Sequence, residues 1–146
     1  MTAIYLHNTL SGKKEEFKPL KKGQVHIYNC GPTVYDTVHI GNLRTFVLYD
    51  LVRRVFEYEK YKVTQAMNIT DVDDKTIKRS QQERTSLEKL TKHYQELFLK
   101  DIESLNILKA TKLLSARDHI KDMINLISIL LEKKVAYIAK VLWKRC

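Results

Sequence analysis

The 146-residue sequence is poor in several residues that mark small-protein classes: it has two cysteines, two prolines, four glycines and one tryptophan. Cys30 and Cys146 lie far apart, and neither belongs to a CxxC pair. The sequence therefore supports neither a disulfide framework nor a self-contained zinc site. The composition also excludes a collagen-like or disordered chain. With 44% hydrophobic residues, one globular domain is the expectation.

Long hydrophobic runs are missing as well. The longest apolar stretch, from Met123 to Leu131, contains Asn125 and Ser128 and ends before Glu132. A membrane span needs roughly 20 apolar residues. At the N-terminus the charges follow a weak apolar patch, which is not the order of a secretory signal. We therefore expect a cytoplasmic protein with no membrane partner.

Positive charge is in excess, with 26 lysines and arginines against 17 aspartates and glutamates and a net charge of +9. The surplus is spread evenly along the chain, and most of it is lysine. Lysine is a hydrated point charge rather than a planar phosphate fork, so a solvated surface explains much of the surplus. Charge alone leaves contact with nucleic acid open.

The first structural pattern is a short β-prone run at 25–30, bounded by Gly23 and Gly31. It predicts a buried strand that ends at Cys30. Over 43–60, apolar residues then recur near helical spacing, with charged residues largely on the other side. This segment predicts an amphipathic helix.

A second strand is predicted over 62–69. The acidic stretch that follows, 70–75, predicts a helix start capped by Thr70 or Asp71, because carboxylates are favoured in the first turn. The order strand, helix, strand over 23–82 predicts an α/β fold with parallel strands and a crossover helix. Such a unit is half of a doubly wound, Rossmann-like sheet, which binds ligands beyond the carboxyl ends of its strands.

The flanking segments carry weaker patterns. Residues 1–22 can pair as a hairpin at the sheet edge. Two apolar stripes at helical spacing, 87–105 and 120–131, predict a helical segment over 83–134.

Candidates for chemistry cluster where the loop after the first strand turns into the helix. Unpaired N–H groups at a helix N-terminus attract phosphate. Gly41 lets a base or a phosphate approach the backbone, and His39 and Asn42 can each donate a hydrogen bond to an oxygen that gains negative charge. The structural alternative is that Asn42 caps the helix, Gly41 relieves a turn and His39 is a surface residue.

The longer string YNCGPTVYDTVHIGNLRTF at 28–46 resembles the signature region of class I aminoacyl-tRNA synthetases, and its CGPTVYD points to the cysteinyl branch. NITDVDDK at 68–75 and LNIL at 105–108 are similar to the same branch, as is the opening YLHNTLSGKKEEFKP. The resemblance runs from about Tyr5 to about Ala139. It implies the first half of a Rossmann-like (HUP-type) catalytic domain.

The resemblance also implies roles for single residues. His39 and Asn42 would be catalytic, holding the phosphates of Mg²⁺-bound ATP while the carboxylate of L-cysteine attacks the α-phosphorus. The implied nucleotide-binding residues are Gly31, Pro32, Thr33, His39, Gly41 and Asn42. The implied neighbours of cysteine and its adenylate are Cys30, Thr33, Thr45, Asn68 and Thr70.

Zinc enters through the resemblance too. Cys30 matches one of four zinc ligands in the family, where the metal captures the substrate thiolate and so excludes serine. The family's other three ligands, and the KMSKS loop that closes on ATP, belong to a region that these 146 residues do not contain. A buried, inert thiol is the structural alternative for Cys30.

The match weakens toward the carboxyl end. A Ser-Ala-Arg triplet at 115–117 stands where the family often has Arg-Ala-Thr, and the tail 140–146 does not resemble the family. His119 matches a family histidine but is a weaker candidate than His39. We therefore expect 1–146 to be an incomplete catalytic domain. Either the gene product is truncated or frameshifted, or a split enzyme has a second, carboxyl-terminal polypeptide.

The favoured interpretation is the amino-terminal catalytic part of an enzyme that activates L-cysteine with ATP and transfers it to tRNA(Cys), the isolated chain being inactive. One alternative is a ligase that joins activated cysteine to an amino sugar. The opening NTLSGKKEEFKP at 8–19 favours the synthetase. Another alternative is a non-catalytic module that binds nucleotide or tRNA.

Overall fold

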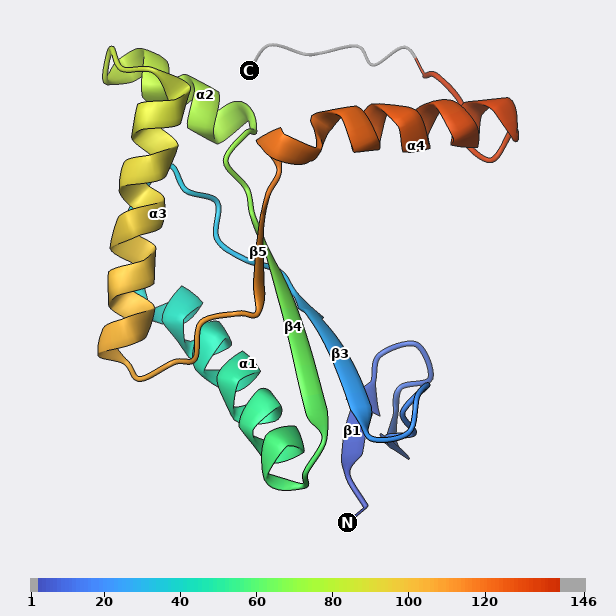
Figure 1. The fold of residues 1–146 in the computed structure, drawn as a ribbon. Helices are drawn as coiled ribbons and strands as arrows, with labels where there is room; N and C mark the ends of the chain where they lie inside the picture. Colours follow the sequence, from blue (N-terminus) through green and yellow to red (C-terminus); the bar gives the residue numbers. More distant parts are fainter. Residues whose placement is uncertain (1–2, 140–146) are drawn as a thin grey trace.

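The computed structural model describes residues 3–139 (Figure 1). The predicted tail 140–146 lies outside the described residues. None of the described helices is both long enough and apolar enough to cross a membrane. In chain order the elements are β1 (Tyr5–Asn8), β2 (Lys13–Glu16), β3 (Gln24–Asn29), α1 (Ile40–Tyr58), β4 (Lys62–Ile69), α2 (Asp74–Gln82), α3 (Leu87–Ser104), β5 (Lys112–Ser115), the 3-10 helix η1 (Arg117–His119) and α4 (Ile120–Glu132).

A three-stranded parallel sheet with the order β3–β4–β5 forms the centre of the fold. α1 is the crossover between β3 and β4, so the predicted α/β architecture is confirmed. β4 has the predicted bounds. β3 ends at Asn29 instead of Cys30, and α1 begins at Ile40, three residues before the predicted start.

The segment 83–134 is not wholly helical, contrary to the prediction. Between α3 and α4, β5 pairs in parallel with β4 and places Ser115 opposite Ile69. A four-residue strand such as KLLS has too few positions for its period to differ from that of the neighbouring helical stripes. Its pairing with β4 makes it a strand.

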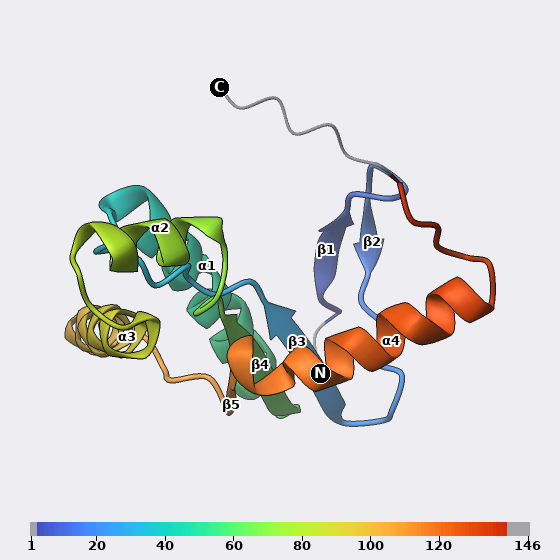
Figure 2. The same cartoon turned by 90° about the horizontal axis from the view of Figure 1, so that it is seen from above.

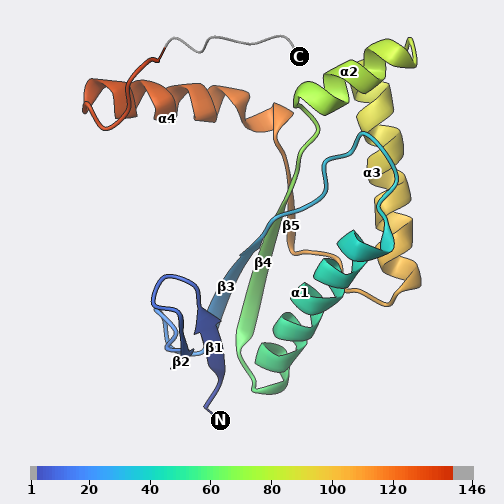
Figure 3. The same ribbon diagram turned by 180° about the vertical axis from the view of Figure 1, so that it is seen from behind.

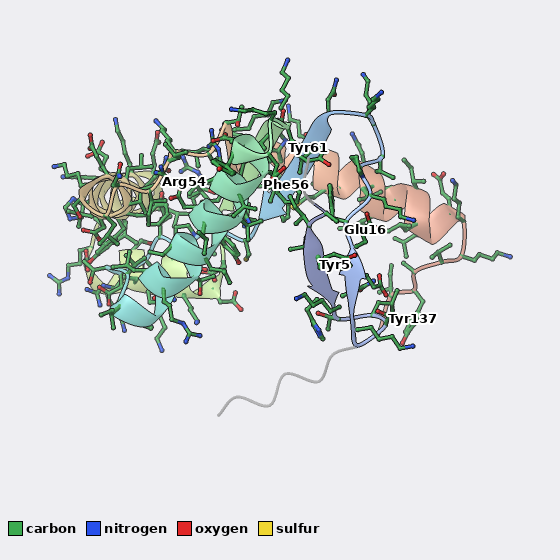
Figure 4. The ribbon with its side chains drawn as sticks, turned by 90° about the horizontal axis from the view of Figure 1, so that it is seen from below. Tyr5, Glu16, Arg54, Phe56, Tyr61 and Tyr137 are labelled. Atoms are coloured by element: carbon green, nitrogen blue, oxygen red, sulfur yellow. The ribbon has the colours of Figure 1, made fainter. Side chains whose placement is uncertain are left out.

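Residues 1–22 include the predicted hairpin, but it does not extend the central sheet. β1 and β2 pair antiparallel as a separate two-stranded sheet, with Tyr5 opposite Glu16. The ring of Phe17, directly after β2, meets Phe56 edge-on with centroids 4.7 Å apart, and Tyr61 at 6.4 Å. These aromatic contacts hold the hairpin against the carboxyl end of α1, near which Figure 4 shows Tyr5 and Glu16.

The core lies between the sheet and the helices on one side of it (Figures 1 and 2). Phe46 of α1 and Phe98 of α3 meet with ring centroids 4.9 Å apart, and both are buried. Val34 of the loop after β3 is 1% exposed and belongs to the same cluster. This packing fixes that loop to the sheet. The buried cluster consists of Val34, Phe46, Met67, Ile69, Phe98 and Ile102.

α4 leaves the carboxyl end of the sheet and extends away from α1 and α3 (Figures 1 and 2). It contains no buried residue. Leu130 and Leu131 are half-buried. The other large apolar side chains of α4 are 41–57% exposed; they are Ile120, Met123, Ile124, Leu126, Ile127 and Ile129.

Candidate functional site

A pocket of about 480 Å³ lies at the carboxyl end of β3, the edge at which open parallel sheets bind ligands. Its walls come from the loop 30–39, the first turns of α1 and the start of α2. Figure 3 shows this loop running from β3 past α2 and α3 to the beginning of α1. The predicted site residues that line the pocket are Cys30, Gly31, Pro32, Thr33, His39, Asn42 and Thr45. Three others, Gly41, Asn68 and Thr70, do not line it.

His39 and Asn42 form a reciprocal cap at the start of α1. His39 is the N-cap residue, and its Nδ1 accepts a hydrogen bond from the backbone N–H of Gly41 at 3.0 Å. The backbone N–H of His39 donates to Oδ1 of Asn42 at 3.3 Å. The structural alternative in the sequence analysis named Asn42 as the N-cap. The N-cap is instead His39, and Asn42 completes the cap from the first turn of the helix. Both side chains hold the helix start and line the pocket.

This cap determines which polar atoms remain for a ligand. Because Nδ1 of His39 accepts a hydrogen bond, the neutral imidazole carries its proton at Nε2. Because Oδ1 of Asn42 is an acceptor in the cap, the amide group that remains is the Nδ2 donor. The pocket therefore has two side-chain donors beside a helix N-terminus, a combination suited to an anionic oxygen.

Gly41 controls the position of the His39 ring. A Cβ atom at residue 41 would lie 2.8 Å from Cε1 and 3.0 Å from Nδ1 of that imidazole. The ring can fold over the helix end only because Gly41 has no side chain. Although Gly41 does not line the pocket itself, it allows the orientation of a residue that does.

Gly31 is required by the sheet. A Cβ atom at residue 31 would lie 1.7 Å from the backbone oxygen of Asn68, so the two segments approach too closely for any side chain. The backbone N–H of Gly31 donates to Oδ1 of Asn68 at 3.0 Å. The loop after β3 is therefore anchored directly on β4.

Thr70 continues this anchoring one step further along. Its backbone N–H donates to the backbone oxygen of Pro32 at 3.0 Å. Its backbone oxygen accepts from the backbone N–H of Val34 at 3.2 Å. Its Oγ1 accepts from Nδ2 of Asn68 at 3.2 Å. Asn68 and Thr70 thus hold the pocket loop from behind.

Cys30 is exposed and lines the pocket, so the alternative of a buried thiol is wrong. Within residues 3–139, no group of three histidine, cysteine, aspartate or glutamate side chains is placed to hold a metal ion. A lone thiolate does not provide the three or four protein ligands of a zinc site. The described residues therefore do not fit zinc.

The acidic stretch after β4 serves the local structure. Asp73, not Thr70 or Asp71, is the N-cap of α2: its Oδ1 accepts from the backbone N–H of Thr76 at 2.8 Å. Its own N–H donates to Oγ1 of Thr76 at 2.8 Å. Two orphan donors of the helix end are satisfied in this way. The predicted cap was misplaced by two or three residues.

Asp71 instead joins β4 to the segment after β5. Its carboxylate is buried and accepts from Oγ of Ser115 at 2.6 Å and from the backbone N–H of Arg117 at 3.0 Å. Nε of Arg117 lies 3.5 Å from the same carboxylate. His119, the weaker histidine candidate, lies 2.9 Å from Asp122 and does not line the pocket.

Sequence reasoning missed part of the pocket lining. Phe46 stood in the helical stripe and at the end of the signature string without an assigned role, and Tyr49 was not singled out at all; their place beside the pocket follows from the packing of α1. Tyr35 lay inside the signature string but had no assigned role. Lys75 was overlooked because the stretch in which it stands was considered for its carboxylates.

A parallel α/β sheet with a crossover helix, and with a tight loop and a helix N-terminus at its carboxyl edge, is an architecture of the Rossmann-like type. The family model "tRNA synthetases class I (C) catalytic domain" matches residues 16–144. The chain therefore belongs to the family of class I synthetase catalytic domains that this model describes.

Curated relatives agree with the family. The chain is 51% identical over 130 residues to a cysteine–tRNA ligase of Brachyspira hyodysenteriae, covering 89% of the chain and 27% of that relative. It is 46% identical over 134 residues to a cysteine–tRNA ligase of Protochlamydia amoebophila and 47% identical over 134 residues to one of Staphylococcus aureus. These matches cover 92% of the chain and 28% and 29% of the relatives. The chain thus spans less than a third of their length.

Proposed function

We propose that this chain supplies the ATP-binding part of a cysteine–tRNA ligase active site. ATP, with Mg²⁺, would occupy the pocket at the end of β3, and L-cysteine would lie beside it. tRNA(Cys) would be the final acceptor in a complete enzyme acting in the cytoplasm. The proposal rests on the family and on one geometric observation, the reciprocal cap of His39 and Asn42.

The cap supports a catalytic role because it fixes two donors before a ligand arrives. In adenylate formation, a carboxylate oxygen of L-cysteine attacks the α-phosphorus, and pyrophosphate leaves with the electron pair of the broken P–O bond. Negative charge develops on the phosphate oxygens during attack. Donors already held in place stabilise this charge without reorganising at that moment. Nε2–H of His39 and Nδ2–H₂ of Asn42 would have this role.

The other lining residues would define the site around these donors. The loop Gly31, Pro32 and Thr33 would border the nucleotide, and Thr45 and Cys30 would border the amino acid and its adenylate. Asn68 and Thr70 would contribute by holding the loop in place rather than by forming the wall we expected from the sequence.

The complete reaction would need more of the enzyme than this chain provides. Because the chain spans 27–29% of its relatives, we propose that residues of the same or a second polypeptide complete the active site. The 146 residues alone would then bind ATP weakly and would not aminoacylate tRNA(Cys).

The test is a titration of the ¹⁵N-labelled 146-residue chain with Mg²⁺-ATP, followed by NMR. We expect saturable shifts of the backbone amides of Gly41 and Asn42. His39→Ala should lower the apparent affinity for Mg²⁺-ATP. The control is His93→Ala, which replaces an exposed histidine on α3 and should not change this affinity. Absence of saturable shifts in the unsubstituted chain would contradict the proposal.

Two activity measurements separate the reaction classes. Cysteine-dependent exchange of pyrophosphate into ATP reports adenylate formation, and acceptance by tRNA(Cys) or by an amino sugar reports the second step. Clear cysteinyl-tRNA formation by the purified chain, with no partner added, would overturn the expectation of an incomplete site.

A further inference from the structure

Lys75 stands out among the described residues that line the pocket, because it is the one side chain there with a permanent positive charge. Asp36 is the one lining residue with a carboxylate, and His39 is neutral in the tautomer that its cap requires. Without Lys75, the side chains of the described lining would carry a net negative charge. A pocket that receives a triphosphate needs the opposite sign.

The place of Lys75 in α2 conflicts with helix electrostatics. α2 begins after its N-cap Asp73, so Asp74 and Lys75 are its first and second residues. The partial positive charge of a helix N-terminus favours Asp74 there and disfavours Lys75. A residue that breaks a local rule without a structural gain is a sign of function.

The surroundings of Lys75 give no such structural gain. Its Nζ lies 5.5 Å from the centroid of the Tyr35 ring, which also lines the pocket. The Tyr35 ring is half-buried and Lys75 is exposed, and a cation–π contact at such a partly solvated place contributes only about 1 kcal/mol. None of the ion pairs found within residues 3–139 includes Lys75. The Lys75 ammonium therefore lies at the pocket with one weak contact. An anionic ligand in the pocket would bind it more strongly than the Tyr35 ring does.

We propose that Lys75 is a triphosphate-binding residue of this pocket. The ammonium moves from the Tyr35 ring to the outer phosphate oxygens of ATP, while His39 and Asn42 face the phosphate that is attacked. Lysine suits this task as a compact point charge on a flexible stem, with three donors and no required angle. This inference rests on the proposed function, since it assigns the part of ATP that α2 recognises.

The inference makes a chemical distinction that ATP binding alone does not make. Contact with the outer phosphates contributes to the binding of ATP, contributes less to that of ADP, and does not contribute to that of adenosine. Loss of Lys75 should therefore reduce the preference of the pocket for ATP over adenosine. A structural role for Lys75 would instead change the affinity for both ligands equally.

The test compares Lys75→Met with Lys78→Met, which removes an exposed lysine of the same helix that does not line the pocket. Both variants lose one positive charge, so the total charge of the chain is matched. Mg²⁺-ATP and adenosine are titrated separately into the ¹⁵N-labelled 146-residue chain, and the amides of Gly41 and Asn42 report binding. Lys75→Met should weaken the binding of ATP about tenfold and leave the binding of adenosine unchanged. Lys78→Met should match the unsubstituted chain for both ligands.

Two further measurements separate a loss of ATP binding from a loss of folding. Thermal unfolding of Lys75→Met should occur at the same temperature as in the unsubstituted chain or slightly higher, because an unfavourable charge leaves the helix start. Lys75→Arg should retain most of the preference for ATP. If the unsubstituted chain binds ATP and Lys75→Met binds it equally well, the inference is wrong while the proposed function stands. If the unsubstituted chain binds no ATP, both are wrong.

Discussion

The helices α1 and α4 both carry large apolar side chains, yet the core includes two of them from α1 and none from α4. Phe46 and Phe56 of α1 are 5% and 2% exposed; Phe46 packs with β4 and α3, and Phe56 packs on Phe17, directly after the hairpin. On α4, Ile127 is 54% exposed and no residue is buried. A helical period therefore predicts that a helix exists and which of its faces is apolar. It does not predict what that face meets.

The same difference separates the site from the rest of the carboxyl-terminal part. The pocket lies where α1 and the loop after β3 are fixed to the sheet through the buried cluster, and the start of α2 lines it from one side. α4 is attached through η1 and the network of Asp71. A substitution in the buried cluster beside the pocket should therefore lower the free energy of unfolding by roughly 2–4 kcal/mol more than a substitution on α4.

Phe98→Ala should have the largest effect. Phe98 is 2% exposed and packs on Phe46, so its truncation removes buried apolar surface and leaves a cavity. Such a change typically lowers the free energy of unfolding by about 3–5 kcal/mol. Urea unfolding followed by circular dichroism measures it. A loss below about 1 kcal/mol would show that α3 does not form the core in solution.

Gly31→Ala should come next, with Gly41→Ala as its matched partner. At residue 31 the added methyl meets the backbone of β4, which cannot move aside as a side chain can, and overpacking of this kind costs about 1–3 kcal/mol or more. At residue 41 it meets the imidazole of His39, which can rotate away. Gly41→Ala should therefore change the free energy of unfolding little, but it should weaken the binding of Mg²⁺-ATP. Equal stability loss in both variants would contradict this assignment.

These glycines show how much the sequence could predict. The strand–helix–strand order followed from periodicity, and the signature string 28–46 contains most of the residues that line the pocket at the carboxyl edge of the sheet. The clash that fixes Gly31 depends on the register between the end of β3 and β4, and the folded ring of His39 depends on a cap. β5 was missed for a related reason, because its pairing partner lies 46 residues away in the sequence, Ile69 opposite Ser115, and no local pattern indicates this pairing.

Asp71→Asn should have an intermediate effect and should act at the junction between the two regions. The buried carboxylate accepts bonds from Ser115 and from the backbone of Arg117, and an amide replaces one acceptor oxygen by a donor. Leaving one partner unsatisfied costs about 1–3 kcal/mol. Amide hydrogen exchange should accelerate at Arg117 and in α4 more than in α1. Uniform acceleration throughout the chain would contradict a junction role.

Ile127→Ala should have the smallest effect. Full burial of such a side chain stabilises a protein by about 1.5–3 kcal/mol, but Ile127 is 54% exposed, so less than half of that contribution is present. Alanine is also the better helix former, which offsets part of the loss. We therefore expect a change in the free energy of unfolding below about 1 kcal/mol, measured by urea unfolding beside Phe98→Ala. A loss comparable to that of Phe98→Ala would mean that α4 is covered in solution. Repeating the measurement at several protein concentrations would then show whether a second copy provides the cover, because stabilisation by association grows with concentration.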